Sequence, residues 1–202
     1  MKVIVITTPY FFTEEDRILT TLFESGLDYL HLRKPDTPPI YSERLLSLIP
    51  EQYHKKIVVH DHFYLTKEFN LMGIHLNHRN PEIPENYKGH ISCSCHTFDE
   101  VKRRKGPCDY VFLSPVFNSI SKTGYESHFS GTQLLQASKE KIIDRKTIAL
   151  GGVTTDNIQY AKQLGFGGVA VLGDLWNCFN RFDSNSFDNI IEHFKKLKSF
   201  AE

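Results

Sequence analysis

Eight short apolar runs, separated mostly by helical or polar segments, constrain the fold of this 202-residue chain more than any other feature. Each run has about the length of a β-strand. The runs cover residues 3–7, 29–33, 56–60, 73–76, 91–94, 110–113, 147–150 and 168–172. Strands of a parallel sheet are buried on both faces and therefore read as continuous apolar runs. The pattern indicates a parallel sheet covered by helices.

Several of the intervening segments have the spacing of amphipathic helices. We expect helices over residues 14–25, 41–49, 154–164 and 186–197, and one that begins at Thr97. Gly26 and Gly165 are placed to end two of them, because glycine readily adopts the left-handed conformation of a helix C-terminus. Thr97 and Glu100 have the spacing of a capping box.

Strands that alternate with helices in about 200 residues predict an α/β fold of the (β/α)8 TIM-barrel type, at its small end. The alternative is an open doubly wound sheet, which usually has a glycine-rich turn after its first strand. Here the first strand leads into Thr7-Thr8-Pro9-Tyr10. The glycines instead gather around residues 151–152 and 165–173, where barrels commonly bind phosphate. We predict one TIM-barrel domain over residues 1–202.

The charge balance excludes some classes of partner. Lysine plus arginine and aspartate plus glutamate number 24 each, so the formal net charge is zero. This gives no basic surface for nucleic acid and no reason to expect an anionic membrane as partner. The first residues do not predict a signal peptide, and no apolar run approaches the roughly 18 residues that span a bilayer. A homo-oligomer is compatible with the sequence.

The cysteines indicate a reducing compartment. Cys93, Cys95, Cys108 and Cys178 form no C-x-x-C pair, and the chain is too long to need a disulfide framework. We interpret them as reduced thiols in a cytoplasmic protein. Cys93 and Cys95 lie two residues apart on a predicted strand and share one face, which favours a packing role.

The residues that follow the strands predict an anion-binding mouth, because the carboxyl ends of all barrel strands meet at one end. They comprise cations, hydroxyls, imidazoles, glycines and one carboxylate. They include His31, Arg33, Lys34, His60, Asp61, Asn80, Ser94, Ser119, Ser121, Lys122, Gly151, Gly152 and Gly173. This set suits a diphosphate with Mg²⁺.

Individual residue types support that interpretation. Arg33 offers a planar fork and Lys122 a point charge for phosphate oxygens. Asp61 offers a hard oxygen ligand for Mg²⁺, and Gly151 and Gly152 would let the backbone approach a phosphate closely. Each also has a simpler explanation: Arg33 in an internal ion pair, Asp61 as a capping residue, and the two glycines in a tight turn.

Histidines near the strand ends raise the alternative of a zinc or iron site. These are His31, His60, His62, His75, His78 and His96. Carboxylates are few in this set, and the chain has no H-E-x-x-H helix. Hydrogen bonding to substrate, or packing, is therefore the favoured role for a histidine at this rim.

Four segments, in order, resemble the thiamine phosphate synthase / TenI family over nearly the whole chain. His31-Leu32-Arg33-Lys34 is similar to the family's Q-L-R-x-K, and Val58-Val59-His60-Asp61 is similar to its I-N-D, followed by Gly73-Ile74-His75-Leu76. Residues 109–122 resemble D-Y-V…G-P-V-F-P-T-x-T-K. Ala149-Leu150-Gly151-Gly152-Val153 with Gly168-Val169-Ala170-Val171 resembles A-I-G-G-I…G-V-A-V.

The resemblance implies a transferase of thiamine biosynthesis in a TIM barrel. Such synthases join hydroxymethylpyrimidine diphosphate to thiazole phosphate and release pyrophosphate. The resemblance assigns the pyrophosphate to Arg33 and Lys122, Mg²⁺ to Asp61 with Asn80, and the pyrimidine region to Ser94. His31, Lys34 and His60 would also contact substrate. The thiazole phosphate would lie against Ser119, Ser121, Gly151, Gly152, Leu172 and Gly173.

The chain also departs from the family pattern. His31 replaces a glutamine, His60 an asparagine and Asn80 a second aspartate, while Pro115 stands where the TenI thiazole tautomerases carry a histidine. Two alternatives therefore stay open. One is a TenI-like thiazole tautomerase, and the other is a non-catalytic barrel that binds thiazole or thiamine phosphate.

Overall fold

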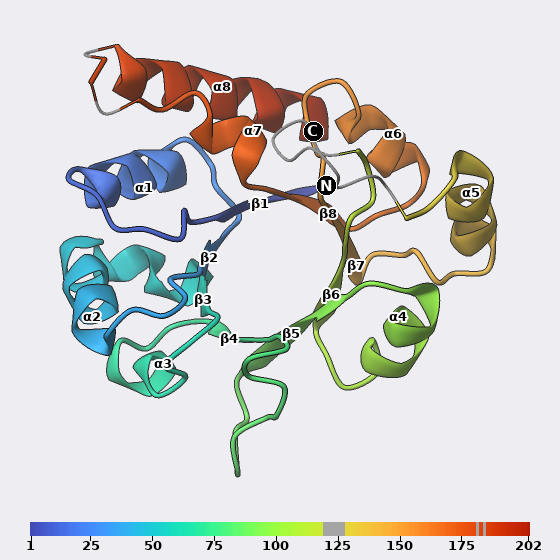
Figure 1. Ribbon diagram of the computed structural model, residues 1–202, viewed down its shortest axis with the longest axis horizontal. Helices are drawn as coiled ribbons and strands as arrows, with labels where there is room; N and C mark the ends of the chain where they lie inside the picture. The colour runs from blue at the N-terminus through green and yellow to red at the C-terminus, as the bar shows by residue number, and fades with distance from the viewer. Residues whose placement is uncertain (119–127, 181, 184) are drawn as a thin grey trace.

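Eight parallel strands form a closed barrel in the computed structural model, which describes residues 1–118, 128–180, 182–183 and 185–202. Neighbouring strands pair in chain order, and β8 closes the barrel against β1 (Figure 1). The strands are β1 (Lys2–Ile6), β2 (Tyr29–Leu32), β3 (Ile57–Val59), β4 (Gly73–Leu76), β5 (His90–Cys95), β6 (Tyr110–Leu113), β7 (Thr147–Leu150) and β8 (Gly168–Val171). The predicted TIM barrel is confirmed, with every strand within two residues of its expected bounds.

The helices form a ring outside the strands (Figure 1). They are α1 (Glu15–Glu24), α2 (Pro39–Leu48), the 3₁₀ helix η1 (Glu51–Lys56), α3 (Leu65–Glu68), α4 (Phe98–Arg104), α5 (Gly131–Lys139), α6 (Ile158–Gln163), α7 (Gly173–Trp176) and α8 (Ser186–Ala201). The five expected helices are present. No helix lies in the fully described connection between β4 and β5, where residues 77–89 extend away from the barrel.

The predicted capping box of α4 forms only in part. The Thr97 hydroxyl accepts the Glu100 N–H at 3.2 Å, as expected for an N-cap. The Glu100 carboxylate, however, accepts the N–H of His96 at 2.5 Å. A reciprocal capping box occurs instead at α5, between Ser130 and Gln133. The carboxylate therefore satisfies a donor one residue before the N-cap.

The barrel interior is divided into an apolar and a polar part. Ile4, Ile6, Phe112, Ile148 and Ala170 form an apolar cluster with Tyr110, contributed by β1, β6, β7 and β8. The interior side of β2, β4 and β5 instead carries fully buried His31, His75 and Ser92. Alternate residues of a strand face the same side, so this polar part is set by the sequence of three strands. Buried polar groups of this kind need internal hydrogen-bond partners.

The cysteines pack in the core. Cys93, Cys95 and Cys108 are buried free thiols, and the sulfur of Cys108 lies 3.5 Å from that of Cys93. The packing role expected for Cys93 and Cys95 is confirmed. Among the described residues, no helix has both the length and the apolar composition that crossing a membrane requires.

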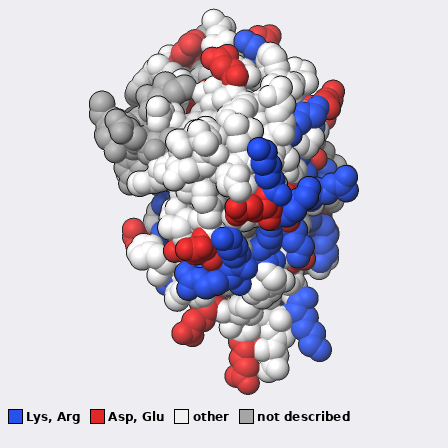
Figure 2. Space-filling view, turned by 90° about the vertical axis from the view of Figure 1, so that its right-hand side faces the viewer, with Lys and Arg blue, Asp and Glu red and all other residues white. Residues whose placement is uncertain are grey.

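Surface charge is mixed rather than one-sided. On the face beside α4, α5 and α6, Lys and Arg side chains gather in one half and have acidic side chains among them (Figure 2). The last turn of α4 carries three basic residues, and Lys105 just beyond it pairs with Asp144 at 2.8 Å. This arrangement agrees with the balanced charge of the sequence.

Candidate functional site

A cavity of about 240 Å³ opens at the carboxyl ends of the strands. It is lined by Ile6, Arg33, His60, Asn77, His78, Arg79, Ser94, His96, Phe112, Leu150 and Leu172. We call it the mouth cavity. Its rim carries two guanidinium groups, and its floor carries neutral polar side chains. Three residues predicted for substrate or diphosphate binding, Arg33, His60 and Ser94, are thus brought together.

Arg33 is anchored through its backbone. Its N–H donates to the Thr7 hydroxyl at 2.9 Å, and that hydroxyl donates to the Arg33 carbonyl at 3.1 Å. Burial, followed by the nearby charge of Arg79, lowers the pKa of Arg33 below its ordinary value. Two guanidinium groups close enough to repel each other gain stability when an anion binds between them.

Asp61 lies at the same rim but is already paired. A guanidinium nitrogen of Arg79 lies 3.1 and 3.2 Å from its two carboxylate oxygens. The Asn80 amide donates to Asp61 Oδ1 at 3.0 Å and to the His60 carbonyl, also at 3.0 Å. The amide oxygen of Asn80 is not used in either bond. Asp61 and Asn80 therefore lie together, as the proposed metal site requires, with Arg79 beside them.

Hydrogen-bonded side chains form the floor of the mouth cavity. His31 Nδ1 lies 2.8 Å from His60 Nε2, and His31 Nε2 lies 2.6 Å from the Tyr110 hydroxyl. His75 bridges two serines, with Nδ1 2.9 Å from Ser92 Oγ and Nε2 2.9 Å from Ser94 Oγ. The rings of His60 and His75 stack at a centroid distance of 4.2 Å.

Burial keeps these histidines neutral. Because the barrel interior excludes water, the pKa of His31 and that of His60 fall well below the usual value, and burial with the nearby His90 lowers the pKa of His75 to about 3. One ring nitrogen from each of the three lies within 4.8 Å of those of the other two, a spacing that also suits a metal ion. Both ring nitrogens of His31 and of His75, and Nε2 of His60, are, however, engaged in hydrogen bonds.

A second cavity, of about 490 Å³, lies beside the first. It is lined by Arg33, Ser114, Pro115, Leu150, Gly151, Gly152, Val153, Thr154, Ala170, Val171, Leu172, Gly173, Asp174, Asn177, Cys178 and His193. We call it the glycine cavity. The predicted phosphate-binding residues Gly151, Gly152, Leu172 and Gly173 all line it. Arg33, Leu150 and Leu172 line both cavities, so the two adjoin.

The two glycines after β7 are required by the backbone. Gly151 and Gly152 have φ angles of +89° and +64°. A Cβ at Gly152 would lie 2.3 Å from the Asn118 carbonyl oxygen, and one at Gly151 would lie 2.8 Å from Pro115. The β7 turn therefore packs directly against the segment that follows β6, and only glycine fits both the conformation and the space.

The glycine cavity is also bordered by a carboxylate–histidine pair, which the sequence analysis did not single out. His193 Nε2 of α8 lies 2.6 Å from Asp174 Oδ2 of α7. Both side chains are partly buried, with exposed fractions of 22% and 16%. The two residues lie 19 positions apart on successive helices, so no short local motif could reveal the pair.

Lys34 takes a different position. Its ammonium lies 2.5 Å from Glu15 Oε1, donates to the Tyr10 carbonyl at 2.7 Å and lies over the Phe11 ring. Only 2% of the Lys34 side chain and 1% of the Glu15 side chain are exposed. Lys34 lines neither cavity, whereas its neighbour Arg33 lines both. Ser119, Ser121 and Lys122, also predicted for the site, lie outside the described residues.

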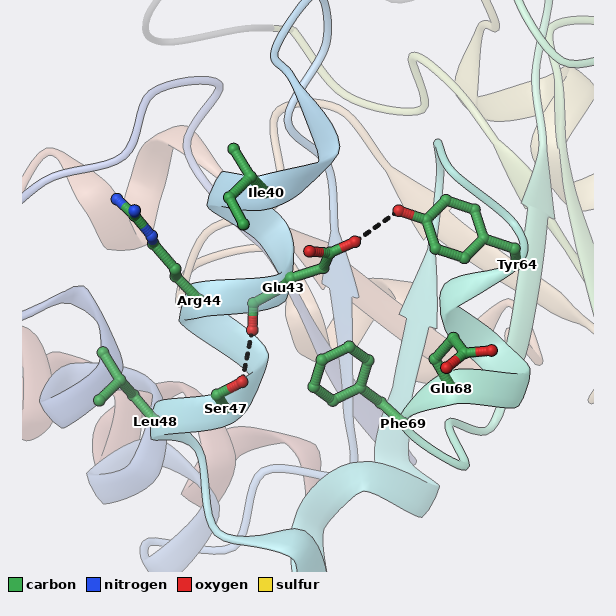
Figure 3. A pocket seen from close by; sticks show the side chains of 8 residues that line it. All are labelled: Ile40, Glu43, Arg44, Ser47, Leu48, Tyr64, Glu68 and Phe69. Carbon is green, nitrogen blue, oxygen red and sulfur yellow. Dashed lines mark hydrogen bonds between the residues drawn. The ribbon is translucent and has the colours of Figure 1, made fainter.

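A wider hollow of about 780 Å³ lies on the outer surface between α2 and α3 (Figure 3). Two of its hydroxyls are bonded locally, since the Tyr64 hydroxyl donates to Glu43 at 2.6 Å and Ser47 donates to the Glu43 carbonyl at 2.9 Å. This open groove faces away from the strand ends. The chemistry gathers in the two cavities at the mouth.

The comparisons identify the family. A family model described as thiamine monophosphate synthase matches residues 3–175. The chain belongs to this family. A thiamine-phosphate synthase of Flavobacterium johnsoniae is 25% identical over 178 residues, covering 80% of this chain and 82% of that protein. One of Phocaeicola vulgatus is 28% identical over 167 residues, covering 75% and 79%.

Solved structures agree with this family. A crystal structure of thiamine phosphate pyrophosphorylase from Bacteroides thetaiotaomicron has 59% sequence identity and a TM-score of 0.93, covering 100% of this chain and 98% of that one. A thiamine phosphate pyrophosphorylase from Pyrococcus furiosus, at 18% identity and a TM-score of 0.71, supports the fold; it covers 99% and 95%. Thiamine-phosphate synthesis, a transferase reaction, is the function these relatives support for this family member.

Proposed function

We propose that the protein joins hydroxymethylpyrimidine diphosphate to thiazole phosphate, releasing pyrophosphate and forming thiamine phosphate. The observation that carries this assignment is the pair of adjoining cavities, which share Arg33, Leu150 and Leu172. A joining reaction needs two substrates held in contact at their reacting atoms, and positioning of this kind supplies a large part of the rate enhancement. The mouth cavity would take the diphosphate and the glycine cavity the thiazole phosphate.

Arg33 and Arg79 would hold the diphosphate at the rim. Negative charge grows on this group as its bond to the pyrimidine carbon breaks, so cations fixed beside it stabilise the transition state. Arg79 is held by Asp61 and is thereby kept at the rim. Lys122, on the strength of the family resemblance, is proposed as a further cation at the leaving group.

Asp61 and Asn80 fit a Mg²⁺ ion in donor chemistry. They offer one carboxylate and one amide oxygen, and Mg²⁺ is typically held by one or two carboxylates together with substrate phosphates and water. Asp61 would have to release one oxygen from Arg79, which would leave that guanidinium facing the diphosphate. When bound, the ion supplies positive charge to the leaving pyrophosphate.

The thiazole phosphate would lie against the backbone of Gly151, Gly152, Leu172 and Gly173. The N–H groups of Gly152 and Gly173 donate to no carbonyl or side chain in the part of the chain that the structure describes. Free amides at the turns after the last two strands are a recurrent phosphate site in barrels. Ser119 and Ser121 are proposed to assist.

Buried free thiols support a cytoplasmic location.

A second candidate function is a proton shift on thiazole phosphate, as in a TenI-like tautomerase. The Asp174–His193 pair at the glycine cavity favours it, because a histidine oriented by a carboxylate is a suitable proton carrier. The third candidate function, a barrel that only binds thiazole or thiamine phosphate, requires neither this pair nor the cationic side chains at the rim of the mouth cavity.

One assay separates these functions. Purified protein is incubated with both heterocyclic substrates and Mg²⁺, and thiamine phosphate and pyrophosphate are measured. We expect equal amounts of the two products. Arg33→Ala and Lys122→Ala should each lower kcat about 100-fold or more, whereas Arg44→Ala, in the outer groove, should leave kcat unchanged.

Other outcomes would decide for the alternatives. No joining, together with isomerisation of a thiazole phosphate that His193→Gln abolishes, would establish the tautomerase. Binding of thiazole phosphate without either reaction would establish the carrier.

A further inference from the structure

The connection between β4 and β5 differs from every other connection between consecutive strands, each of which contains a helix. It projects outward instead of folding back onto the barrel (Figure 1). Residues 81–86, which we call the arm, are all exposed. In the part of the chain that the structure describes, their one hydrogen bond is a turn in which the Pro84 carbonyl accepts the Tyr87 N–H at 3.1 Å. The arm therefore has almost its whole surface available for a partner.

The arm nevertheless has a defined shape. At its start, the backbones of Asn77 and Asn80 bond each other, at 3.1 and 3.2 Å. At its end, the Tyr87 ring packs against the hydrophobic core. Pro81 and Pro84 restrict the backbone between these two anchors. A segment that is already ordered loses little conformational entropy when it binds, so the arm is suited to insertion into a groove.

The arm presents one apolar side chain among charged ones. Ile83 is 43% exposed, and it lies between Glu82 and Glu85 in the sequence. Lys88 follows and is also exposed. None of the three charged side chains forms an ion pair with another described residue. An exposed isoleucine flanked by unpaired charges is typical of a contact surface rather than of a solvated loop.

The outer groove between α2 and α3 has the matching character (Figure 3). Its apolar side chains Ile40, Leu48 and Tyr64 are 46%, 62% and 49% exposed. Arg44 comes from α2 and Glu68 from α3, and neither forms an ion pair with a described residue. The groove thus offers an apolar seat for an aliphatic side chain and an unpaired charge of each sign.

The charges of the arm and the groove are complementary when two pairs form together. Arg44 would face the acidic residues Glu82 and Glu85, and Glu68 would face Lys88. The remaining acid of the groove, Glu43, already accepts the hydrogen bond of the Tyr64 hydroxyl. Complementary charges fix the register of an interface more than they add affinity.

The positions of the two surfaces favour a second copy of this chain as the occupant. Around the barrel the order is α2, α3 and then the arm, so α3 separates the arm of a chain from its own groove (Figure 1). A two-fold axis beside α3 places the arm of each copy opposite the groove of the other. Such an interface is self-complementary and closes at two subunits.

We propose that the protein forms a two-fold symmetric dimer in which the arm of each copy lies in the outer groove of the other. Ile83 would pack among Ile40, Leu48 and Tyr64 of the other copy. Once one arm is seated, the second contact forms at a high effective concentration, so two small contacts suffice for a stable dimer. The mouth and glycine cavities are each lined by one chain, so the proposal goes beyond the proposed function and does not depend on it.

The first experiment measures the mass in solution by sedimentation over a range of protein concentrations. We expect the unmodified protein to have twice the chain mass of 23.4 kDa. Ile83→Asp in the arm and Leu48→Asp in the groove should each raise the dissociation constant of the dimer on the order of 100-fold, because each places a charge in an apolar contact. Leu135→Asp is the matched control, since Leu135 is 50% exposed on α5 and should leave the dimer intact.

The second experiment tests whether the arm and the groove contact each other. Arg44→Glu alone and Glu82→Lys/Glu85→Lys alone should each weaken the dimer about 10-fold or more, because like charges then face each other. The triple variant Arg44→Glu/Glu82→Lys/Glu85→Lys should recover most of the lost affinity. Additive losses without recovery would overturn the proposal.

Two further outcomes would also overturn it. One is a monomer at every concentration, which would leave the groove to a partner of another kind. The other is a dimer that neither Ile83→Asp nor Leu48→Asp weakens, which would place the interface elsewhere. These readouts are masses and dissociation constants, so they stand whether or not the protein joins its two substrates.

Discussion

The Glu15–Lys34 pair and the histidine floor are both buried and polar, but one is charged and the other neutral. The pair is a single short contact at 2.5 Å, and Glu15 Oε2 has no hydrogen-bond partner among the described residues. In the floor, the bonds among the imidazoles and hydroxyls are made by groups that can both donate and accept. A buried charge pair holds two segments together at a high free-energy cost of removing the charges from water, whereas a neutral hydrogen-bonded network satisfies its buried polar groups at lower cost.

The two clusters also respond oppositely to pH. Burial raises the pKa of Glu15 to about 7 despite Lys34 beside it, so its contribution to stability falls as pH rises from 4.5 toward 7. The pKa of His75 lies at about 3, below its ordinary value of 6.5, so its contribution falls as pH decreases. The predictions below test this contrast in order of decreasing effect on stability.

The largest loss is expected for Lys34→Met. It leaves the Glu15 carboxylate buried without a cation, which should lower the free energy of unfolding by about 3–5 kcal/mol, measured by urea denaturation. The double variant Lys34→Met/Glu15→Leu should recover most of the loss. A small loss of stability with a raised KM for the diphosphate would instead place Lys34 at the substrate, as the family resemblance implied.

Acidification should destabilise the protein through the floor. Below pH 6.5 His75 is protonated in the unfolded chain but remains neutral in the folded one. This residue should therefore lower the free energy of unfolding by up to about 1.4 kcal/mol per pH unit until the pH approaches 3. His75→Gln, whose amide can still donate and accept but cannot titrate, should have a shallower slope between pH 6.5 and 5. Identical slopes would show that His75 is accessible to protons in the folded state.

Arg79→Gln should separate stability from activity. Its pair with Asp61 is partly exposed, at 26% and 16%, so we expect a loss of only about 1 kcal/mol in the free energy of unfolding. If Arg79 stabilises the leaving pyrophosphate, kcat should still fall about 10-fold or more. A change confined to stability would reduce Arg79 to a structural partner of Asp61.

The smallest effect is expected for Arg17→Ala. Arg17 pairs with Glu14 at 2.5 Å, but the two side chains are 64% and 49% exposed. An ion pair in water contributes little, so the free energy of unfolding should change by at most about 0.5 kcal/mol. If Arg17→Ala lowered the free energy of unfolding as much as Lys34→Met, burial would not be the factor that determines how much each ion pair stabilises the protein.

The fold was predictable because most strands are short runs dominated by apolar residues and the longer helices span two or more periods. The short elements were not: α3 and α7 have four residues each, too few to show a period. Helix α5 has a capping box, and its apolar face buries Leu134 and Ala137, but the sequence analysis did not predict this helix. The sequence thus predicts where the strands and longer helices lie better than it predicts how many short helices there are.

The site was predictable only at the strand ends. The rule that these ends meet brought Arg33, Ser94 and the two glycines to one mouth, with Asp61 beside Arg79 at its rim. Arg33 and Lys34, which directly follow β2, nonetheless separate, because Arg33 lines both cavities whereas Lys34 is buried against Glu15. The Tyr110–His31 contact joins residues 79 positions apart, and it depends on how the strands are staggered around the barrel, which no local pattern records.

The wall of Leu150 and Leu172 between the two cavities has a consequence for inhibitor chemistry. A single molecule that reaches over this wall into both cavities would bind its second half at a high effective concentration, set by the length of its linker. Because both residues contact each cavity, a short linker would suffice, and its stiffness would determine how much of the combined affinity is gained. The shared wall therefore makes the site a target for bisubstrate ligands as well as a place where two substrates meet.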